Sequence, residues 1–597
     1  MKKHSSNQVL SILSKPAIVL LLVMGLYFLG AALLSSVTSL LYNETLPLPS
    51  LNRLLAGRDL HPLSHYLSYF LYLYRMVFLL LAGFVAYFAI TRPTAFSRRF
   101  PHLAIFFEAI LMALLSIFVF SQRIPLEVGL YDEGLILTGA WQFSLGAIPY
   151  RDFYNIYGPG QVAILGILFS LFGKSIFVAH LYDLLIRVAI TLVVWGILRP
   201  LVHPMLRLFA HVATICWLYY FGLTLYPVYP ALFFQLATIF VLLLPSTRPS
   251  SFPRYFCAGL LAGFSILFRH DIGTLFALLI FALLWVPLIA PVVPTSQPRP
   301  PVIFALGVIL PPALVYGVFT FLVPIPVLWR QLVQMPLFVF PAYRSIPYPT
   351  PSHLLSSPGE TAPFYMFPLI FLTFTGLSLF QTFRTRTLPP PRRAVFFLAT
   401  LAAAGIPQAL GRSDIAHLLP FSLPLVPLFF LSFSQSKRLI PLVVIFLCWS
   451  AFYVYRPIVK RIIVPLYGDS IPPDIGPLKE VICQSPPGPI FVGNRFHDSL
   501  SVNHPGLYFL LDRLPATLYF SYEPGEITTA PVQSEIVCEL EEKSVQTLVL
   551  WDESPVTEPN RAAEDSHARV LDPYIQGHYH RTVDIPPYSI WSRLPQN

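Results

Sequence analysis

Residues 302–323 read VIFALGVILPPALVYGVFTFLV, a run of apolar and small residues without a single Asp, Glu, Lys or Arg. An α-helix needs about 20 such residues to cross the hydrocarbon core of a bilayer. Similar runs recur from residue 17 to about residue 455. Of all residues, 55% are hydrophobic and only 11% are charged, whereas soluble domains carry about 25% charged residues. The chain is therefore predicted to be an α-helical polytopic membrane protein, because so few charges could not cover a globular surface.

About thirteen spanning helices are predicted. The apolar stretch 161–173 is too short to span comfortably, so we expect a juxtamembrane or re-entrant helix there. The apolar run that follows Met1-Lys2-Lys3 is far longer than the h-region of a signal peptide, so we expect an uncleaved first helix. The predicted spans lie near 17–41, 67–91, 102–121, 175–198, 207–224, 231–245, 255–268, 272–292, 302–323, 363–382, 395–410, 417–433 and 439–455.

The distribution of Lys and Arg predicts the orientation. With the N-terminus in the cytoplasm, the inner segments hold seventeen of these residues in roughly seventy positions, and the outer loops hold about nine in nearly twice the length. With an odd number of spans, everything after residue 456 lies outside the cytoplasm. The membrane is predicted to be a plasma or inner membrane. The net charge of +10 does not indicate a nucleic-acid partner, because the arginines are spread over short loops instead of clustering on one face.

The segment from about 470 to 597 differs from the rest of the chain. Short β-like runs at 489–493, 516–520 and 547–551 alternate with amphipathic stretches such as Val532 to Lys543. This alternation predicts a small α/β domain in which the three runs are neighbouring strands of one sheet. Cys483 and Cys538 would be able to pair in an oxidising compartment, but we expect two free, buried thiols.

Four regions follow from this pattern. They are the N-terminal transmembrane helices (1–121), the first outer loop with its juxtamembrane helices (122–174), the transmembrane core (175–455) and an extracytoplasmic α/β domain (456–597).

The first long outer loop carries the adjacent acids Asp132 and Glu133. Carboxylates near hydrocarbon lose hydration, which raises their pKa, and such a group can act as a general base toward a hydroxyl. Sugar transfer from a phosphate carrier needs that base, together with cations that hold the departing phosphate. The alternative is that both acids cap the helix that begins there, and the spacing alone leaves both interpretations open. Asp152, which follows Arg151, is more simply half of a local ion pair.

Several motifs around this loop resemble the GT-C superfamily of membrane glycosyltransferases. They are Asp132-Glu133 after an early spanning helix, Gly146-x-x-Pro149-Tyr150, Tyr157-Gly158-Pro159-Gly160, and Leu171-Phe172-Gly173 closing the next helix.

The nearest branch resembles the one that holds the protein O-mannosyltransferases and the aminoarabinose transferase of lipid A. The resemblance covers about 122–455 and is most specific at 131–173. It implies that Asp132 is the catalytic or acceptor-activating acid, with Glu133 beside it. It also implies a polyprenyl-phosphate sugar as donor and inversion at the anomeric carbon. One departure is that the acidic loop follows a third spanning helix, whereas in the family it usually follows the first.

Two short outer loops place polar motifs at the outer ends of predicted spanning helices, and each such end is called a mouth below. The first is Arg269-His270-Asp271, in which the Arg269 guanidinium can hold phosphate oxygens bidentately and His270 can hydrogen-bond or titrate. The alternative is that Arg269 snorkels to the interface with Asp271 as its ion partner.

The second mouth holds Arg412, Ser413, Asp414 and His417. Ser413 or Asp414 is a good candidate for a helix N-cap, whereas capping does not explain Arg412, which is therefore a second phosphate candidate.

Other polar residues have simpler interpretations. Tyr343 and Arg344, in the loop 324–362, are predicted to close over the substrate like a lid. Asp183 and Arg187, spaced i to i+4 within a predicted span, are expected to form an internal ion pair. No metal-site spacing is present, and no cofactor is expected.

These observations predict an inverting glycosyltransferase that moves a sugar from a polyprenyl-phosphate carrier to an acceptor glycan, lipid or protein at the extracytoplasmic membrane surface. A transporter or flippase is the alternative from another class, but transporters typically show related halves and broken helices at the midplane. A non-catalytic subunit in envelope assembly is a third. The candidate catalytic residues are Asp132, Glu133 and Asp152, and the candidate substrate-binding residues are Arg151, Tyr157, Arg269, His270, Arg344, Arg412 and His417.

Overall fold

A computed structural model describes the chain at residues 101–121, 124, 128–245, 252–289, 299–356, 358–434, 475–499, 502–523, 525–552 and 560–595. The predicted spans at 17–41, 67–91 and 439–455 lie outside these residues. The chain divides into two compact units, 1–119 with 451–468 and 120–450 with 469–597. The described part of the first unit belongs to the helix α5 (Pro101–Ser121).

The ten predicted spans from 102–121 to 417–433 all fall on helices. Among the described residues, five helices are long and apolar enough to cross a membrane, which supports an integral membrane protein. Besides α5 these are α8 (Ile176–Leu198), α13 (Pro300–Leu322), α17 (Pro358–Thr385) and α18 (Pro390–Gly411). The total of thirteen spans stays a prediction. The remaining helices at predicted spans are shorter, namely α9 (Pro204–Tyr220), α10 (Val228–Leu243), α11 (Phe252–Phe268), α12 (His270–Leu283), α19 (Leu419–Ser422) and α20 (Leu425–Ser434).

The two faces of α13 show how these helices pack. One face leaves large apolar side chains such as Leu314 and Phe321 exposed, the latter to 90%, which suits contact with lipid chains. The other face meets α11 so closely that a Cβ on Gly259 would lie 2.1 Å from the Phe304 carbonyl oxygen. Small residues commonly allow this backbone contact between spanning helices.

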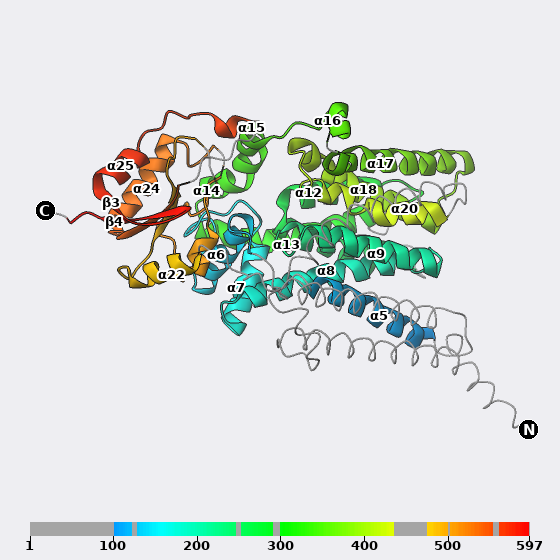
Figure 1. The fold of residues 1–597 in the computed structure, drawn as a ribbon. Coiled ribbons are helices and arrows are strands. Elements are labelled where there is room, and N and C mark those ends of the chain that lie inside the picture. Colours follow the sequence, from blue (N-terminus) through cyan, green and yellow to red (C-terminus); the bar gives the residue numbers. More distant parts are fainter. Residues whose placement is uncertain are drawn as a thin grey trace, which may run out of the picture. The chain divides into compact units, whose positions relative to one another are not determined.

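The C-terminal region forms a four-stranded sheet with helices on both faces (Figure 1). The strand order is β1-β2-β4-β3; β1 and β2 are parallel and the other pairs are antiparallel. Side chains of β2 alternate between the faces, so Leu548 and Leu550 contact one core and Val549 and Trp551 the other. The strands are β1 (Phe491–Asn494), β2 (Thr547–Trp551), β3 (Tyr579–Ile585) and β4 (Tyr588–Arg593), and the covering helices are α22 (Ile475–Gln484), α24 (Ala530–Glu542) and α25 (Leu571–His578).

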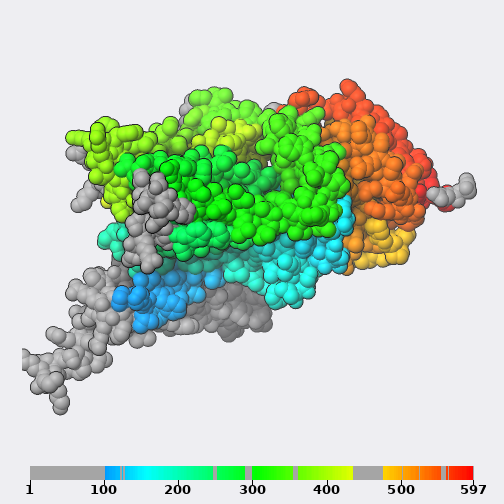
Figure 2. All heavy atoms as spheres, turned by 180° about the vertical axis from the view of Figure 1, so that it is seen from behind, coloured from blue at the N-terminus to red at the C-terminus, as the bar shows by residue number. Residues whose placement is uncertain are grey.

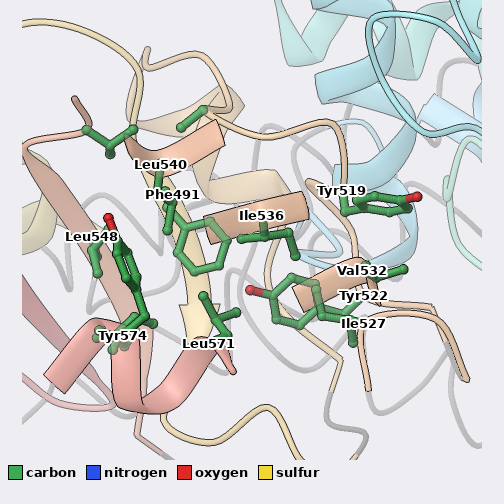
Figure 3. Packing of buried hydrophobic residues seen from close by; sticks show 14 of the residues in the cluster. Phe491, Tyr519, Tyr522, Ile527, Val532, Ile536, Leu540, Leu548, Leu571 and Tyr574 are labelled. Carbon is green, nitrogen blue, oxygen red and sulfur yellow. The ribbon is translucent and has the colours of Figure 1, made fainter. Parts of the chain in front are cut away.

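One face is closed by α24 and α25, whose apolar side chains Ile536, Leu540 and Leu571 pack with Phe491 and Leu548 (Figure 3). The other face is covered by α22. This sheet, in which β1 and β2 are buried on both sides and most of β3 is exposed, confirms the predicted α/β fold of the C-terminal region.

The prediction that 516–520 is a strand is wrong. After one bridge between Ile490 and Pro515 the chain leaves the sheet. Its backbone groups bond elsewhere, since the Leu518 N–H donates to Glu539 and the Leu518 carbonyl accepts from the Tyr154 N–H at 3.1 Å. The apolar side chains are buried without a strand ladder, and the strands β3 and β4 complete the sheet instead.

The expectation that Cys483 and Cys538 are buried is also wrong, because both thiols are free and exposed. On α22 the apolar residues Leu478 and Ile482 occupy the buried face. Cys483 therefore falls on the side of the helix away from the sheet.

The apolar core on the α22 face of the C-terminal sheet also includes residues of the first outer loop. The helices α6 (Asp132–Ser144) and α7 (Gly160–Phe172) contribute Leu135 and Val162 to a cluster with Leu478 and Val492. The helix α7 confirms the helix predicted at 161–173. In the space-filling view the orange C-terminal surface lies directly against the cyan segment that holds α7 (Figure 2).

The closest approach in this contact is between α6 and α23 (Gly506–Leu510). A Cβ on Gly134 would lie 2.3 Å from the Gly506 nitrogen, and the Gly506 N–H donates to the Leu130 carbonyl at 2.8 Å. The Thr138 hydroxyl adds a hydrogen bond to the Pro505 carbonyl at 2.8 Å. The two backbones therefore touch with no room for a side chain.

Replacing Gly134 with Ala should lower the stability of the purified protein by about 1–3 kcal/mol, because the added methyl group meets backbone atoms that cannot move aside cheaply. Thermal unfolding in detergent measures the effect. Gly476→Ala in α22 is the control, since a Cβ there has nothing within 4 Å. Equal melting curves for both variants would contradict this account of the contact.

Candidate active site

The two neighbouring acids of the first outer loop have different environments. Glu133 is 2% exposed; its Oε1 lies 2.6 Å from His180 Nε2 and its Oε2 accepts the Gly129 N–H at 2.9 Å. Glu133 thus fixes the loop to α8 and bonds the backbone N–H of Gly129, whereas the N-cap of α6, Tyr131, has no side-chain cap bond. Asp132, at the first position of α6, is exposed, and its carboxylate hydrogen-bonds the Tyr226 hydroxyl.

Tyrosines from three segments surround Asp132. Tyr131 precedes it, Tyr157 ends the first outer loop, and Tyr226 lies between α9 and α10. Burial raises the pKa of Tyr157 and Tyr226, and the nearby charge of Asp132 raises both further. These hydroxyls therefore stay protonated at neutral pH and act as hydrogen-bond donors beside the carboxylate.

The first cation of the site is Arg269, at the N-cap of α12. Its guanidinium binds Asp271 through two bonds, of 2.9 Å from Nε and 2.5 Å from Nη2, which is the ion pair that the alternative interpretation expected. It also lies 5.4 Å from the centre of the Tyr157 ring. Because Tyr157 feels the charges of both Arg269 and Asp132, it links the cation to the carboxylate.

The second mouth repeats the local construction of the first. Arg412 Nε lies 2.8 Å from Asp414 Oδ2, two residues on, as in Arg269-x-Asp271. The backbone angles also agree: φ −134°, ψ 91° at Arg269 and φ −140°, ψ 100° at Arg412. Each arginine thus follows the end of one helix in an extended conformation and is paired with an aspartate two residues later.

Gln408 of α18 connects the two mouths. Its carbonyl accepts the Arg412 N–H at 3.2 Å. With its side-chain amide turned so that the oxygen faces Arg269, it accepts from that guanidinium at 3.0 and 3.2 Å. Gln408 therefore bonds the Arg269 guanidinium through its side chain and the Arg412 N–H through its backbone, which places the two segments next to each other.

Asp414 also caps the turn before α19, since its Oδ1 accepts the His417 N–H at 2.9 Å and lies 2.8 Å from the His417 ring. Burial opposes ionisation of Asp414, but the bonds from His417 and the charge of Arg412 outweigh it and lower the pKa of Asp414 to about 2. Asp414 therefore caps a turn instead of the helix α19, whose N-cap is Leu418 without a side-chain cap bond, and His417 is placed in the second mouth.

Arg344 ends the segment made of α14 (Ile325–Trp329), the π-helical η1 (Arg330–Val339) and α15 (Phe340–Arg344). Its guanidinium lies 6.0 Å from the centre of the Tyr131 ring, and its carbonyl accepts from Arg412 Nη1 at 3.1 Å. Arg344 therefore lies between Tyr131, which is next to Asp132, and the second mouth.

The segment 325–344 is wedged between the first outer loop and the C-terminal region. The Gln331 side chain bonds the Asn155 N–H and the Tyr150 carbonyl, each at 3.0 Å. Arg330 pairs with Glu526 at 3.2 Å. The lid movement of Tyr343 and Arg344 stays a prediction.

Three other candidates are placed apart from this group or have partners of their own. Arg151 and Asp152 pair at 2.8 Å on an exposed turn, as the ion-pair interpretation predicted. His270, at the start of α12, faces Leu332 of η1. Outside the candidate set, the Asp183–Arg187 pair at 2.9 Å is confirmed within α8.

The structure also adds residues that sequence reasoning missed: Tyr131, Tyr226, Gln408 and Glu523. Tyr131 had a local signal, since it directly precedes the acidic pair. Tyr226, Gln408 and Glu523 had none, because only the packing of distant segments brings Tyr226 and Glu523 to Asp132 and Gln408 to Arg269. Among the described residues, no group of three or more His, Cys, Asp or Glu side chains could hold a metal ion.

Comparison with solved structures shows that the fold of the chain is a known one. The structure of ArnT from Cupriavidus metallidurans bound to undecaprenyl phosphate matches with a TM-score of 0.50 and 12% identity, over 84% of this chain and 100% of that one. The predicted GT-C fold is confirmed.

Two similarities are weaker. The arabinofuranosyltransferase AftD from Mycobacteria matches with a TM-score of 0.43 and 14% identity, over 82% of this chain and 40% of that one. An Archaeoglobus fulgidus oligosaccharyltransferase matches with a TM-score of 0.40 and 13% identity, over 74% of this chain and 67% of that one. Neither a protein-family model nor a curated protein sequence matches the chain.

Proposed function

We propose that this GT-C protein is an inverting glycosyltransferase that moves a sugar from a polyprenyl-phosphate carrier to an acceptor hydroxyl. The observation that carries the proposal is the exposed Asp132 carboxylate, bonded by Tyr226, with the cations Arg269 and Arg344 acting on the neighbouring tyrosines Tyr157 and Tyr131. A carboxylate and several cations in one place suit a reaction in which a hydroxyl loses a proton and a phosphate departs. The fold shared with ArnT, solved with undecaprenyl phosphate, supports a lipid-phosphate carrier.

In this mechanism the acceptor hydroxyl lies beside Asp132 and gives its proton to the carboxylate as it attacks the anomeric carbon. The bond between that carbon and the phosphate oxygen breaks, and the phosphate takes the electron pair. Attack from the side opposite to the leaving group inverts the configuration. Arg269, Arg412 and Arg344 then neutralise the phosphate, each through charge-assisted hydrogen bonds.

The carboxylates Glu133 and Asp152 are secondary candidates for the base. Glu133 is bound to His180 and to the Gly129 N–H, and Asp152 to Arg151. Either would have to leave its partner before it could accept a proton. Asp132 needs no such rearrangement, since it is exposed and its partner is a tyrosine hydroxyl.

The distribution of Lys and Arg supports the remaining parts of the proposal, which are a cytoplasmic N-terminus and an extracytoplasmic site. Residues 456–597 then form an extracytoplasmic domain, and the shared core with the first outer loop suits a role in presenting the acceptor.

The test is sugar transfer by sealed right-side-out membrane vesicles that contain the protein and a panel of labelled polyprenyl-phosphate sugars. Label should pass from one donor to an acceptor glycan, lipid or protein on the outer surface, with opposite anomeric configuration in the product. Vesicles without the protein are the control. No transfer from any donor, or transfer that occurs only in inverted vesicles, would contradict the proposal.

A further inference from the structure

A buried carboxyl of the C-terminal region reaches the Asp132 site. Glu523 is 5% exposed, and the Tyr131 hydroxyl shares its one hydrogen between the Glu523 side chain and the Tyr522 carbonyl, the latter at 3.1 Å. The charge of Glu523 acts on Arg344 and on Asp132. Glu523 thus contacts the residue before the proposed base and faces one of the proposed phosphate ligands.

The segment that carries Glu523 is held firmly in the C-terminal core. The Tyr522 N–H donates to Asn503 at 3.0 Å, and the Tyr522 hydroxyl lies 3.2 Å from His497 Nε2. Tyr522 and Ile527 flank Glu523 and both belong to the apolar cluster on the α24 face of the sheet (Figure 3). Because Tyr522 is anchored and Glu523 itself is buried, the free energy of the Glu523 carboxyl depends on the groups that face it.

We propose that Glu523 is a positioning residue of the Asp132 site, and that its charge tunes the affinity for the anionic donor. It fixes Tyr131 beside the proposed base, and in its ionised form it competes with the donor phosphate for Arg344.

This inference rests on the proposed function. It adds to that function because it makes the C-terminal region part of the site that binds the donor.

The titration of Glu523 predicts the direction in which the donor affinity changes with pH. Burial raises the pKa of Glu523 to about 7, although Arg344 and the Tyr131 bond favour the charged form. Below this pH the side chain is neutral, and above it a second negative charge faces the site. The donor is a phosphodiester and keeps one negative charge throughout, so its binding should weaken as the pH rises through 7. The titratable and charged groups that face Glu523 are Tyr131, Asp132, Arg344, Tyr154, Tyr157 and Glu526.

The experiment compares Glu523→Gln with wild type in the transfer assay at pH 6 and pH 8. Between pH 6 and pH 8 the donor KM of the wild type should rise by roughly tenfold. This factor corresponds to a change of one unit in the pKa of Glu523 when the donor binds. The variant, which is neutral at every pH and keeps the shape of the side chain, should show a nearly level KM.

Glu526→Gln is the matched control. Burial raises the pKa of Glu526 to about 7 as well, but this carboxyl faces Tyr154 and Arg330 instead of Tyr131 and Arg344. Glu526 also acts on Glu523, so its replacement should shift the midpoint of the pH dependence of the donor KM to lower pH and leave the size of the change in place. A general effect of removing a buried acid would change both variants equally.

Arg344→Gln provides a second route to the same answer if the Glu523 variant folds poorly. Since the charge of Glu523 acts on the donor through Arg344, this variant should bind the donor more weakly at both pH values and lose the pH dependence. An unchanged pH dependence in a folded Glu523→Gln or Arg344→Gln protein, or its equal loss in Glu526→Gln, would overturn the inference. Wild type that transfers no sugar at all would instead overturn the proposed function.

Discussion

Asp132→Asn is expected to lower kcat for sugar transfer by roughly 10²–10⁴-fold, the usual cost of removing a general base. Asn keeps the shape of the side chain and can still accept the Tyr226 hydrogen bond, so folding should change little. Steady-state transfer measures the effect, with the sugar donor that the wild-type protein uses. A matched melting curve shows that the variant is folded.

The same replacement separates catalysis from capping. Asn and Asp cap helices about equally well, so a residue that only caps α6 would tolerate the change. In the structure the N-cap residue of α6, Tyr131, makes no side-chain cap bond. Transfer near the wild-type rate in folded Asp132→Asn protein would move the base to Glu133 or Asp152. Near-normal rates in all three single variants would exclude a carboxylate base.

Arg269→Gln should raise the donor KM by roughly 10- to 100-fold, because a hydrogen bond to a charged group contributes about 1.5–3 kcal/mol. The competing explanation is structural, since Arg269 pairs with Asp271 and its loss leaves a poorly exposed carboxylate without its cation. A single variant cannot distinguish these effects.

The double variant Arg269→Gln with Asp271→Asn makes the distinction. If Arg269 serves only to neutralise Asp271, removing both charges should restore the donor KM and the stability. If Arg269 binds the phosphate, the double variant should regain stability and keep the raised KM. Recovery of both quantities would withdraw Arg269 from the site.

The helices of the described region were predictable from composition and run length. All ten predicted spans there fall on helices, and so does the short apolar stretch that became α7. The reason is local, because an apolar segment in a membrane must satisfy its backbone hydrogen bonds within itself. The segment 516–520 has no such constraint, so its apolar residues could be buried without forming a strand.

The candidate site was predictable in part for a similar reason. In the Arg269-x-Asp271 and Arg412-x-Asp414 pairs the two partners are only two positions apart, so the pairs can be recognised in a short stretch of sequence. The division of roles between Asp132 and Glu133 is not recorded in this way, since it depends on which of them His180 of α8 meets.

The sequence by itself determined that the chain is a helical membrane protein, where its helices lie within the described region, and which loops hold its charges. These properties depend on residues close together in the chain and on the low dielectric of the bilayer. Only the tertiary structure decided which polar groups share one site. Tyr226, Gln408 and Glu523 come from three distant segments, and their places beside Asp132, Arg269 and Arg344 follow from how α6, α18 and the C-terminal sheet pack together, which no local pattern specifies.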